Sequence, residues 1–116
     1  MGWFVKEPEL DPGEQVVTTK AANRAQGKRS VGGRLTVTDR RLIFMPNVID
    51  SILAGRAWSI PKADVAGVGA APGMRKRLRV RTSDGGEELF VVNGLDEFVS
   101  QLTQQGLPAE PPEPPA

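Results

Sequence analysis

Short stretches in which apolar and polar residues alternate run through most of the chain, and each of them predicts a β-strand. The clearest stretch is 33–46, where Leu35 and Val37 alternate with threonines in the period of a half-buried strand. Asp39-Arg40 then predicts a tight turn, and a returning strand starts at Leu42. This part of the chain is therefore expected to fold as a pair of antiparallel strands.

Five further segments carry a strand pattern, bounded by Gly, Pro or Asp residues that favour turns. They are residues 14–22, 57–60, 64–70, 77–82 and 89–92. Residues 23–32 are polar and contain two glycines, which predicts a loop for most of that segment.

Two segments carry a helical pattern instead. A short helical turn is predicted at 48–53, where the apolar residues fall on one face. A longer amphipathic helix is predicted near the end of the chain, because apolar residues recur there at the spacing i, i+3, i+4 and i+7. Its apolar residues are Leu95, Phe98, Val99 and Leu102. We expect Asn93 to be its N-cap with Asp96 in the capping-box position, and Gly106 and Pro108 to end it.

The sum is about seven strands in mostly adjacent hairpins, followed by one helix. A small open sheet has two exposed edges and one uncovered apolar face. Curling the sheet and closing one end with the helix removes both problems. The expected fold is mainly β with one α-helix: a seven-stranded antiparallel, partly open barrel capped by the C-terminal helix.

The order of four short motifs resembles the GRAM domain, a branch of the pleckstrin-homology-like (PH-like) family. The resemblance covers roughly residues 10–104, with Thr36 and Lys62 as departures. It implies a PH-like barrel and a non-catalytic module that binds membranes, phosphoinositides or proteins, and it carries over no ligand. The motifs are Leu10-x-Pro12-Gly13-Glu14, Gly33-x-Leu35-x-Val37-Thr38 with Arg41-Leu42-Ile43-Phe44, Trp58-x-Ile60-Pro61-x-x-Asp64-Val65, and Leu78-x-Val80-x-Thr82.

The 116 residues suffice for one domain, and we place it at residues 10–106, after an N-terminal extension of residues 1–9. Residues 107–116 are rich in Pro and Glu and are expected to form an extended, disordered tail. The first residues lack the pattern of a secretory signal, and no apolar run is long enough to span a membrane. The predicted location is the cytoplasm, with peripheral association at the inner face of the membrane as an option.

The composition argues against catalysis and against a bound cofactor. The chain has no Cys, His or Tyr, which removes disulfides, the commonest zinc ligands and the usual general base near neutral pH. The carboxylates match turns, strand ends and the start of the helix. We therefore predict that the protein is not an enzyme and holds neither metal nor cofactor.

Residues 13–106 are moderately basic, with 14 Lys and Arg against nine Asp and Glu, a net charge of +5. One basic group covers the loop after the first predicted strand and the ends of the strands that flank it, with no acidic residue among residues 20–34. A loop of this kind at a barrel mouth is a candidate site for anionic phospholipid head groups. The alternative is a solvated surface loop. The group comprises Lys20, Arg24, Lys28, Arg29 and Arg34.

A second basic group covers the predicted strand 77–82 and the two residues before it. The alternation of the strand places Arg77, Arg79 and Arg81 on one face. One interpretation is an arginine face for phosphate, and the other is ion pairing with Glu87 and Glu88 on the next strand. Nucleic acid would use the same face, but aromatic residues for base stacking are scarce, which argues against it. The group comprises Arg75, Lys76, Arg77, Arg79 and Arg81.

Two short apolar segments are candidates for contact with a membrane or a partner protein. Trp3 and Phe4 precede the domain and are expected either to fold back over it or to insert at a membrane interface. The segment 48–53 is expected to cover the core or to contact a bilayer or partner. The predicted function is a non-catalytic binding module on anionic membranes. The alternative is a protein-interaction or homo-oligomerisation module without a lipid ligand.

Overall fold

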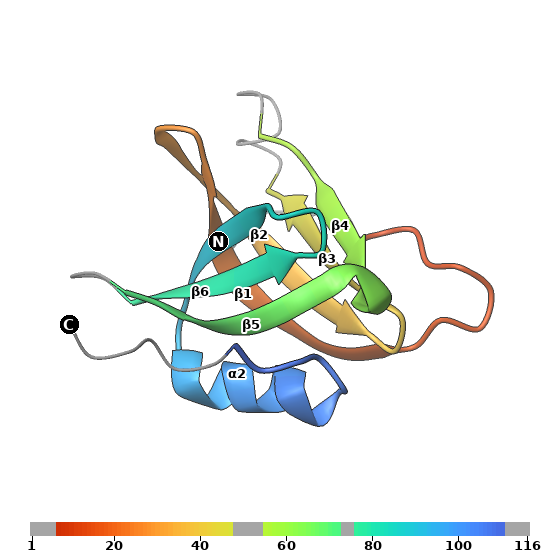
Figure 1. The fold of residues 1–116 in the computed structure, drawn as a ribbon. Coiled ribbons are helices and arrows are strands. Elements are labelled where there is room, and N and C mark those ends of the chain that lie inside the picture. Colours follow the sequence, from red (N-terminus) through yellow and green to blue (C-terminus); the bar gives the residue numbers. More distant parts are fainter. Residues whose placement is uncertain (1–6, 48–54, 73–75, 111–116) are drawn as a thin grey trace.

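A computed structural model describes residues 7–47, 55–72 and 76–110. These residues form one antiparallel sheet of seven strands in the order β4-β3-β2-β1-β7-β6-β5, followed by one α-helix (Figure 1). The predicted fold class is therefore confirmed. The strands are β1 (Val16–Gln26), β2 (Arg29–Thr38), β3 (Arg41–Pro46), β4 (Trp58–Pro61), β5 (Val65–Ala71), β6 (Arg77–Thr82) and β7 (Glu87–Val92), with the 3₁₀ turn η1 (Lys62–Asp64) and the helix α2 (Leu95–Gln104).

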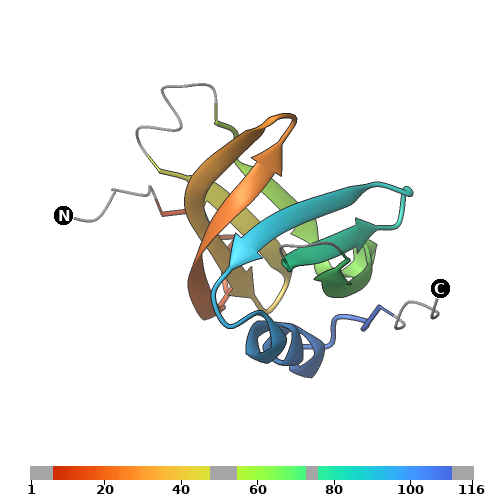
Figure 2. The ribbon, with the colours of Figure 1, turned by 90° about the vertical axis from the view of Figure 1, so that its left-hand side faces the viewer.

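The central strand β1 joins the two halves of the sheet. It pairs with β2 almost throughout its length, but with β7 only at residues 22–24. The sheet curls about this strand, and α2 lies beneath its lower end (Figure 2). The 3₁₀ turn η1 connects β4 to β5, so the chain itself passes between the two edge strands.

The core fills the curl between the two halves and the helix. Phe44 from β3 and Phe90 from β7 are fully buried, with their ring centroids 5.7 Å apart. Phe98 and Leu102 bring the apolar face of α2 against them, as the i, i+4 spacing of these two residues predicts. The helix thus closes one end of the curled sheet, and we call the opposite end, where β1, β4 and β7 meet, the mouth.

Gly33 in β2 allows the backbone of the neighbouring strand β3 to approach closely. Gly33 pairs with Ala22 on one side and with Pro46 on the other. A Cβ atom at Gly33 would lie 2.1 Å from the backbone oxygen of Met45, a distance that real Cβ atoms do not show. Only glycine fits this position.

A buried carboxylate fastens the N-terminal turn to the β2–β3 connection. Glu14 is 6% exposed, and Arg41 donates to it from Nε and Nη2, each at 2.9 Å. The hydroxyl of Thr38 donates to Glu14 at 2.6 Å, and the N–H of Asp11 donates to it at 2.9 Å. The hydrogen bonds from Arg41 outweigh burial and, with those from Thr38 and Asp11, lower the pKa of Glu14 from 4.5 to about 2.

Three expectations from the sequence were wrong, each for a local reason. Most of the expected loop 23–32 is a hairpin, because β1 continues to Gln26 and turns at Gly27, whose φ is 61°. Asn93 is not the N-cap of α2. Gly94 takes that place in the left-handed region, and no side chain caps the helix. The tail does not begin at residue 107, because residues 107–110 lie against β5.

Two other expectations, the helical turn at 48–53 and the placement of Trp3 and Phe4, lie outside the described residues. Residues 111–116 of the expected tail also lie outside them. Apart from residues 107–110, the division into an extension, a domain and a tail stays a prediction.

We expect Gly33→Ala to lower the free energy of unfolding by about 3 kcal/mol, because the added methyl group meets backbone rather than a movable side chain. Urea denaturation followed by tryptophan fluorescence measures this. Gly67→Ala is the matched control, since its Cβ would lie 3.5 Å from its nearest neighbours and should change stability little. Equal stability of the two variants would contradict the close approach at Gly33.

We expect acid to destabilise the protein through Glu14. A carboxylate whose pKa is lowered on folding stabilises the native state above its unfolded value, and that contribution disappears as the pH falls from about 4.5 towards 2. The shift corresponds to about 3 kcal/mol. Glu14→Gln should therefore be less stable at neutral pH and should flatten the loss of stability below pH 4.5. Thermal melts across this pH range test it, with the exposed Glu87→Gln as a control that should keep the wild-type profile.

Candidate functional site

The first basic group lies on the β1–β2 hairpin rather than on a loop, so successive side chains point to opposite faces. Lys20 and Arg24 pair with Leu35 and Val31, both buried, and therefore share the inner face. Arg34 is exposed. The structure does not bring the five cations together as one site.

Arg24 closes the open mouth of the curled sheet. Its Nε donates to Glu88 Oε1 at 2.8 Å, and its Nη1 donates to the backbone oxygen of Arg56 at 3.2 Å. Its guanidinium lies 5.9 Å from the ring centroid of Trp58, which in turn packs on Phe90. Arg24 is thus committed to contacts within the fold.

Lys20 is committed in the same way at the other end of the sheet. Its stem lies on the inner face, and its Nζ is 5.7 Å from the ring centroid of Phe98 in α2. This cation–π contact helps to hold the helix against β1.

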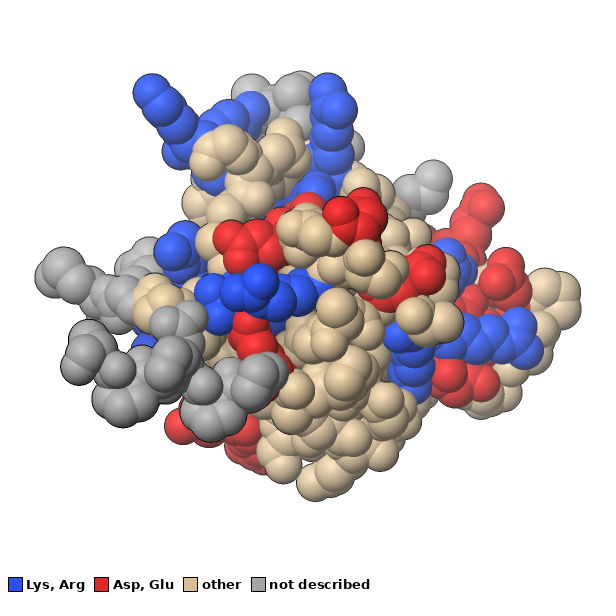
Figure 3. All heavy atoms as spheres, viewed as in Figure 1, with Lys and Arg blue, Asp and Glu red and all other residues tan. Residues whose placement is uncertain are grey.

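Two exposed cations of the hairpin lie at its tip. Lys28 and Arg29 lie at the β1–β2 turn and are exposed, and so is Arg56, which precedes β4. The N–H of Arg56 donates to the side-chain oxygen of Gln26 at 3.1 Å, which fastens the two segments together. We call Lys28, Arg29 and Arg56 the basic tip. Figure 3 shows Lys and Arg side chains projecting at this end of the molecule, over the hairpin and over the chain that enters β4.

Sequence reasoning missed Arg56. It lies 30 residues from Gln26, and no local pattern connects the two. Sequence reasoning also missed Lys62, whose Nζ donates to the backbone oxygen of Gln105 at 3.0 Å just after α2. A cation at a helix C-terminus compensates the unpaired carbonyl groups there, which gives this departure from the GRAM-like pattern a structural role.

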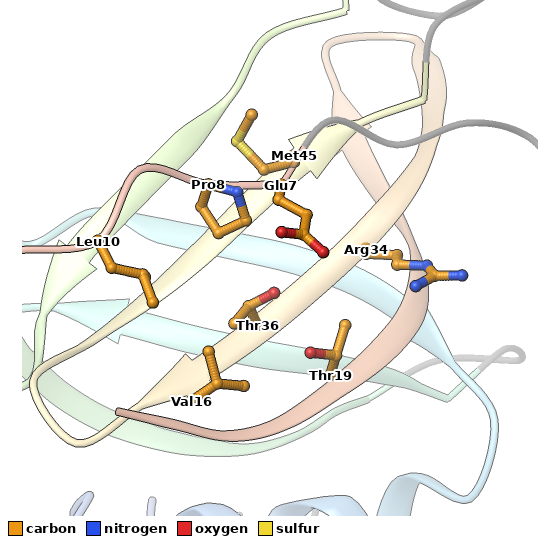
Figure 4. A pocket seen from close by; sticks show the side chains of 8 residues that line it. All are labelled: Glu7, Pro8, Leu10, Val16, Thr19, Arg34, Thr36 and Met45. Atoms are coloured by element: carbon orange, nitrogen blue, oxygen red, sulfur yellow. The ribbon is translucent and has the colours of Figure 1, made fainter. Parts of the chain in front are cut away.

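Arg34 belongs to a different place, a pocket of about 220 Å³ on the outer face of β1, β2 and β3. Figure 4 shows Glu7, Pro8 and Leu10 of the N-terminal segment facing the sheet across this pocket. The exposed side chains of Leu10 and Val16 add apolar surface at its rim. Its lining is completed by Thr19, Arg34, Thr36 and Met45.

The second basic group follows the predicted alternation, but its main partner is unexpected. The side chains at 78 and 80 are buried in the core, and Arg77, Arg79 and Arg81 share the other face. Arg79 lies 4.0 Å from Glu87, whereas its Nη2 is 2.9 Å from Oε1 of Glu110, which Arg81 also contacts.

The other two residues of the group and the other expected partner have different places. Glu88 pairs with Arg24 across the mouth of the sheet. Lys76 is exposed, and Arg75 lies outside the described residues.

Within residues 7–47, 55–72 and 76–110, no group of three acidic side chains could hold a metal ion. Of the helices that the structure describes, none has the length and apolar character to cross a membrane.

Comparison with solved structures places this arrangement in a known fold. The chain matches the "Vps36 N-terminal PH domain" with a TM-score of 0.63 and 20% identity, over 87% of this chain and 84% of the other. It matches linker-DH/PH domains of p115-RhoGEF with a TM-score of 0.65 and 10% identity, over 88% of this chain and 32% of the other. The fold is PH-like.

A third match is the C-terminal domain of an unknown protein from Leishmania infantum, with a TM-score of 0.70 and 18% identity, over 81% of this chain and 85% of that one. No family model matches the sequence, and neither does any curated protein. At these identities the likeness establishes the fold alone.

We expect Arg24→Met to lower the free energy of unfolding by about 1 to 3 kcal/mol, because Glu88 loses its charged partner while it stays half-buried. Lys28→Met at the exposed tip should leave stability nearly unchanged. Urea denaturation of both variants measures the difference. If the two variants unfold at the same urea concentration, Arg24 does not close the mouth.

Proposed function

We propose that this chain is a non-catalytic GRAM-like binding module that associates with anionic membrane surfaces through the basic tip. The proposal rests on one observation. The β1–β2 hairpin extends past its pairing with β7 and carries exposed cations at its end. Anionic head groups attract such a projecting cluster without a deep pocket.

The ordered motifs support the GRAM assignment within the PH-like fold. The structure explains one residue in each of two motifs. Gly33 permits the close approach of β2 to β3, and Glu14 fastens the N-terminal turn to Arg41. A module with this fold that acts in the cytoplasm would meet anionic lipid at the inner face of the membrane.

The expected attraction is weak for a single module. Each exposed Lys or Arg near an anionic surface contributes about 1 kcal/mol, so three contribute about 3 kcal/mol. A millimolar dissociation constant requires roughly 4 kcal/mol. Stable recruitment therefore needs several copies in one assembly or a second contact with the membrane.

Co-sedimentation with vesicles tests the proposal. We expect the protein to pellet with vesicles that contain phosphatidylserine, not with pure phosphatidylcholine, and salt should weaken the pelleting. The triple variant Lys28→Gln, Arg29→Gln, Arg56→Gln should lose it and keep the wild-type melting temperature. A matched control removes the same charge elsewhere through Arg34→Gln, Arg40→Gln, Lys76→Gln, three exposed sites. If the control loses pelleting equally, the basic tip is not the site.

A second candidate function is a protein–protein or homo-oligomeric contact through the outer face of β1. The observation that favours it is the exposure of Leu10 and Val16, two large apolar side chains that both line the pocket on this face. A concentration-dependent dimer in sedimentation velocity that Val16→Ser abolishes, without pelleting on acidic vesicles, would favour this function over lipid binding.

A further inference from the structure

The chain after α2 adds itself to the open edge of β5. The backbone N–H of Val68 donates to the oxygen of Pro108 at 2.9 Å, and the N–H of Glu110 donates to the oxygen of Val68 at 2.8 Å. Ala109 thereby forms a parallel bridge with Val68, and Leu107, 3% exposed, anchors the segment in the core. An edge strand offers unpaired N–H and C=O groups to any extended segment, and here residues 108–110 use them.

Two positions of β5 beside this edge are glycines, and the side chain of Glu110 lies over them. Gly67 and Gly69 pair with Arg81 and Arg79 of β6. A Cβ on Gly69 would lie 3.1 Å from both Cβ and Oε2 of Glu110. Because the two glycines have no side chains, the carboxylate of Glu110 can cross β5 and reach Arg79 and Arg81.

The arginines hold that carboxylate as a built anion site. Arg79 is itself buried and donates from Nε to Oε2 of Glu110 at 3.1 Å, while its Nη2 lies 2.9 Å from Oε1. Arg81 contacts Oε1 from the next position along the same face. The Glu110 side chain is 9% exposed. Burial by itself would raise the pKa of Glu110, but the hydrogen bonds from Arg79 and Arg81 outweigh it and lower the pKa.

The anion site continues along β6 beyond Arg79 and Arg81, to Arg77. A segment continuing in the parallel direction runs from Val68 towards Ala71, which pairs with Arg77. Among the described side chains, Nε of Arg77 is a buried nitrogen without a hydrogen-bond partner. A second carboxylate, two residues after the first, would be on the same side of an extended segment and would approach Arg77.

The sequence of this chain has no carboxylate at that position. Two residues after Glu110 the chain has Pro112, which carries no charge. Alternate N–H groups of a segment donate to the neighbouring strand in a parallel ladder, so the next donor after Glu110 is also at this position. Proline has no N–H to donate. A segment with an acidic residue there gains both a hydrogen bond and an ion pair.

We propose that the edge of β5 with Arg77, Arg79 and Arg81 is a docking groove for an extended acidic peptide of a partner protein. The peptide carries two carboxylates two residues apart, with a residue other than proline at the second. Residues 107–110 occupy this acidic-peptide groove in cis and are displaced by the partner. This site shares no residue with the basic tip, so its test is independent of lipid binding.

The test uses the full chain and a fluorescein-labelled probe peptide, Leu-Pro-Ala-Glu-Pro-Glu, in fluorescence anisotropy. We expect Glu110→Gln to bind the probe at least roughly tenfold more tightly than the wild type does, because a short tethered competitor acts at an effective concentration near millimolar. A probe with both Glu replaced by Gln should lose this binding. A probe ending in Pro instead of the second Glu should bind more weakly than the first.

Arg81→Gln, made in the Glu110→Gln background, should weaken binding at least roughly tenfold. The Arg81 side chain is 51% exposed, so the substitution is compatible with folding. Arg34→Gln in the same background is the matched control and should bind as its parent does. Vesicle pelleting of all these variants should follow the wild type, since the basic tip is intact.

Three results would overturn the proposal: equal probe affinity of wild type and Glu110→Gln, full binding after Arg81→Gln, or a wild-type dimer that Glu110→Gln abolishes. The dimer would mean that the segment occupies the groove of a second copy. An NMR titration of the wild type with excess probe gives a readout free of substitutions. Amide shifts at Gly67, Val68 and Gly69 support the groove, and shifts confined to other strands refute it.

Discussion

The double pairing of β1 gives this molecule its shape. One strand belongs to both halves of the sheet, with β2 along nearly all of it and β7 along three residues. The two halves curl around one shared core, and Gly33 lets β2 approach the backbone of Met45 in the β2–β3 part of the sheet. The core, the helix at one end and the open mouth at the other are consequences of that curl.

The same curl decides which cations are available for function. On a flat strand, Lys20 and Arg24 would be two of five similar basic side chains. On the inner face of a curled sheet they lie against Phe98 and Trp58, where they contribute to packing. Two exposed cations of this group, Lys28 and Arg29, lie at the hairpin end, where Arg56 joins them from a distant part of the chain.

The edge strand β5 has a structural role, and in our proposal it is also a binding site. An unpaired edge strand invites association with other chains, and here a short segment after α2 covers it. The cover is short: two backbone hydrogen bonds, one carboxylate on two arginines and the buried side chain of Leu107. A contact of this kind protects the edge when no partner is present and is weak enough for a better-matched peptide to replace.

Alternation along the chain predicted the seven strands, the buried face of β6 and the apolar face of α2, because these patterns are local. The sequence also indicated that Arg77, Arg79 and Arg81 share a face. Only the tertiary structure decided which acidic residues pair with the arginines. Arg24 and Glu88 are 64 residues apart, and Arg79 and Glu110 are 31 apart. Pairings over such separations are set by how the sheet curls and where its edge remains open, and no local pattern of residues encodes either.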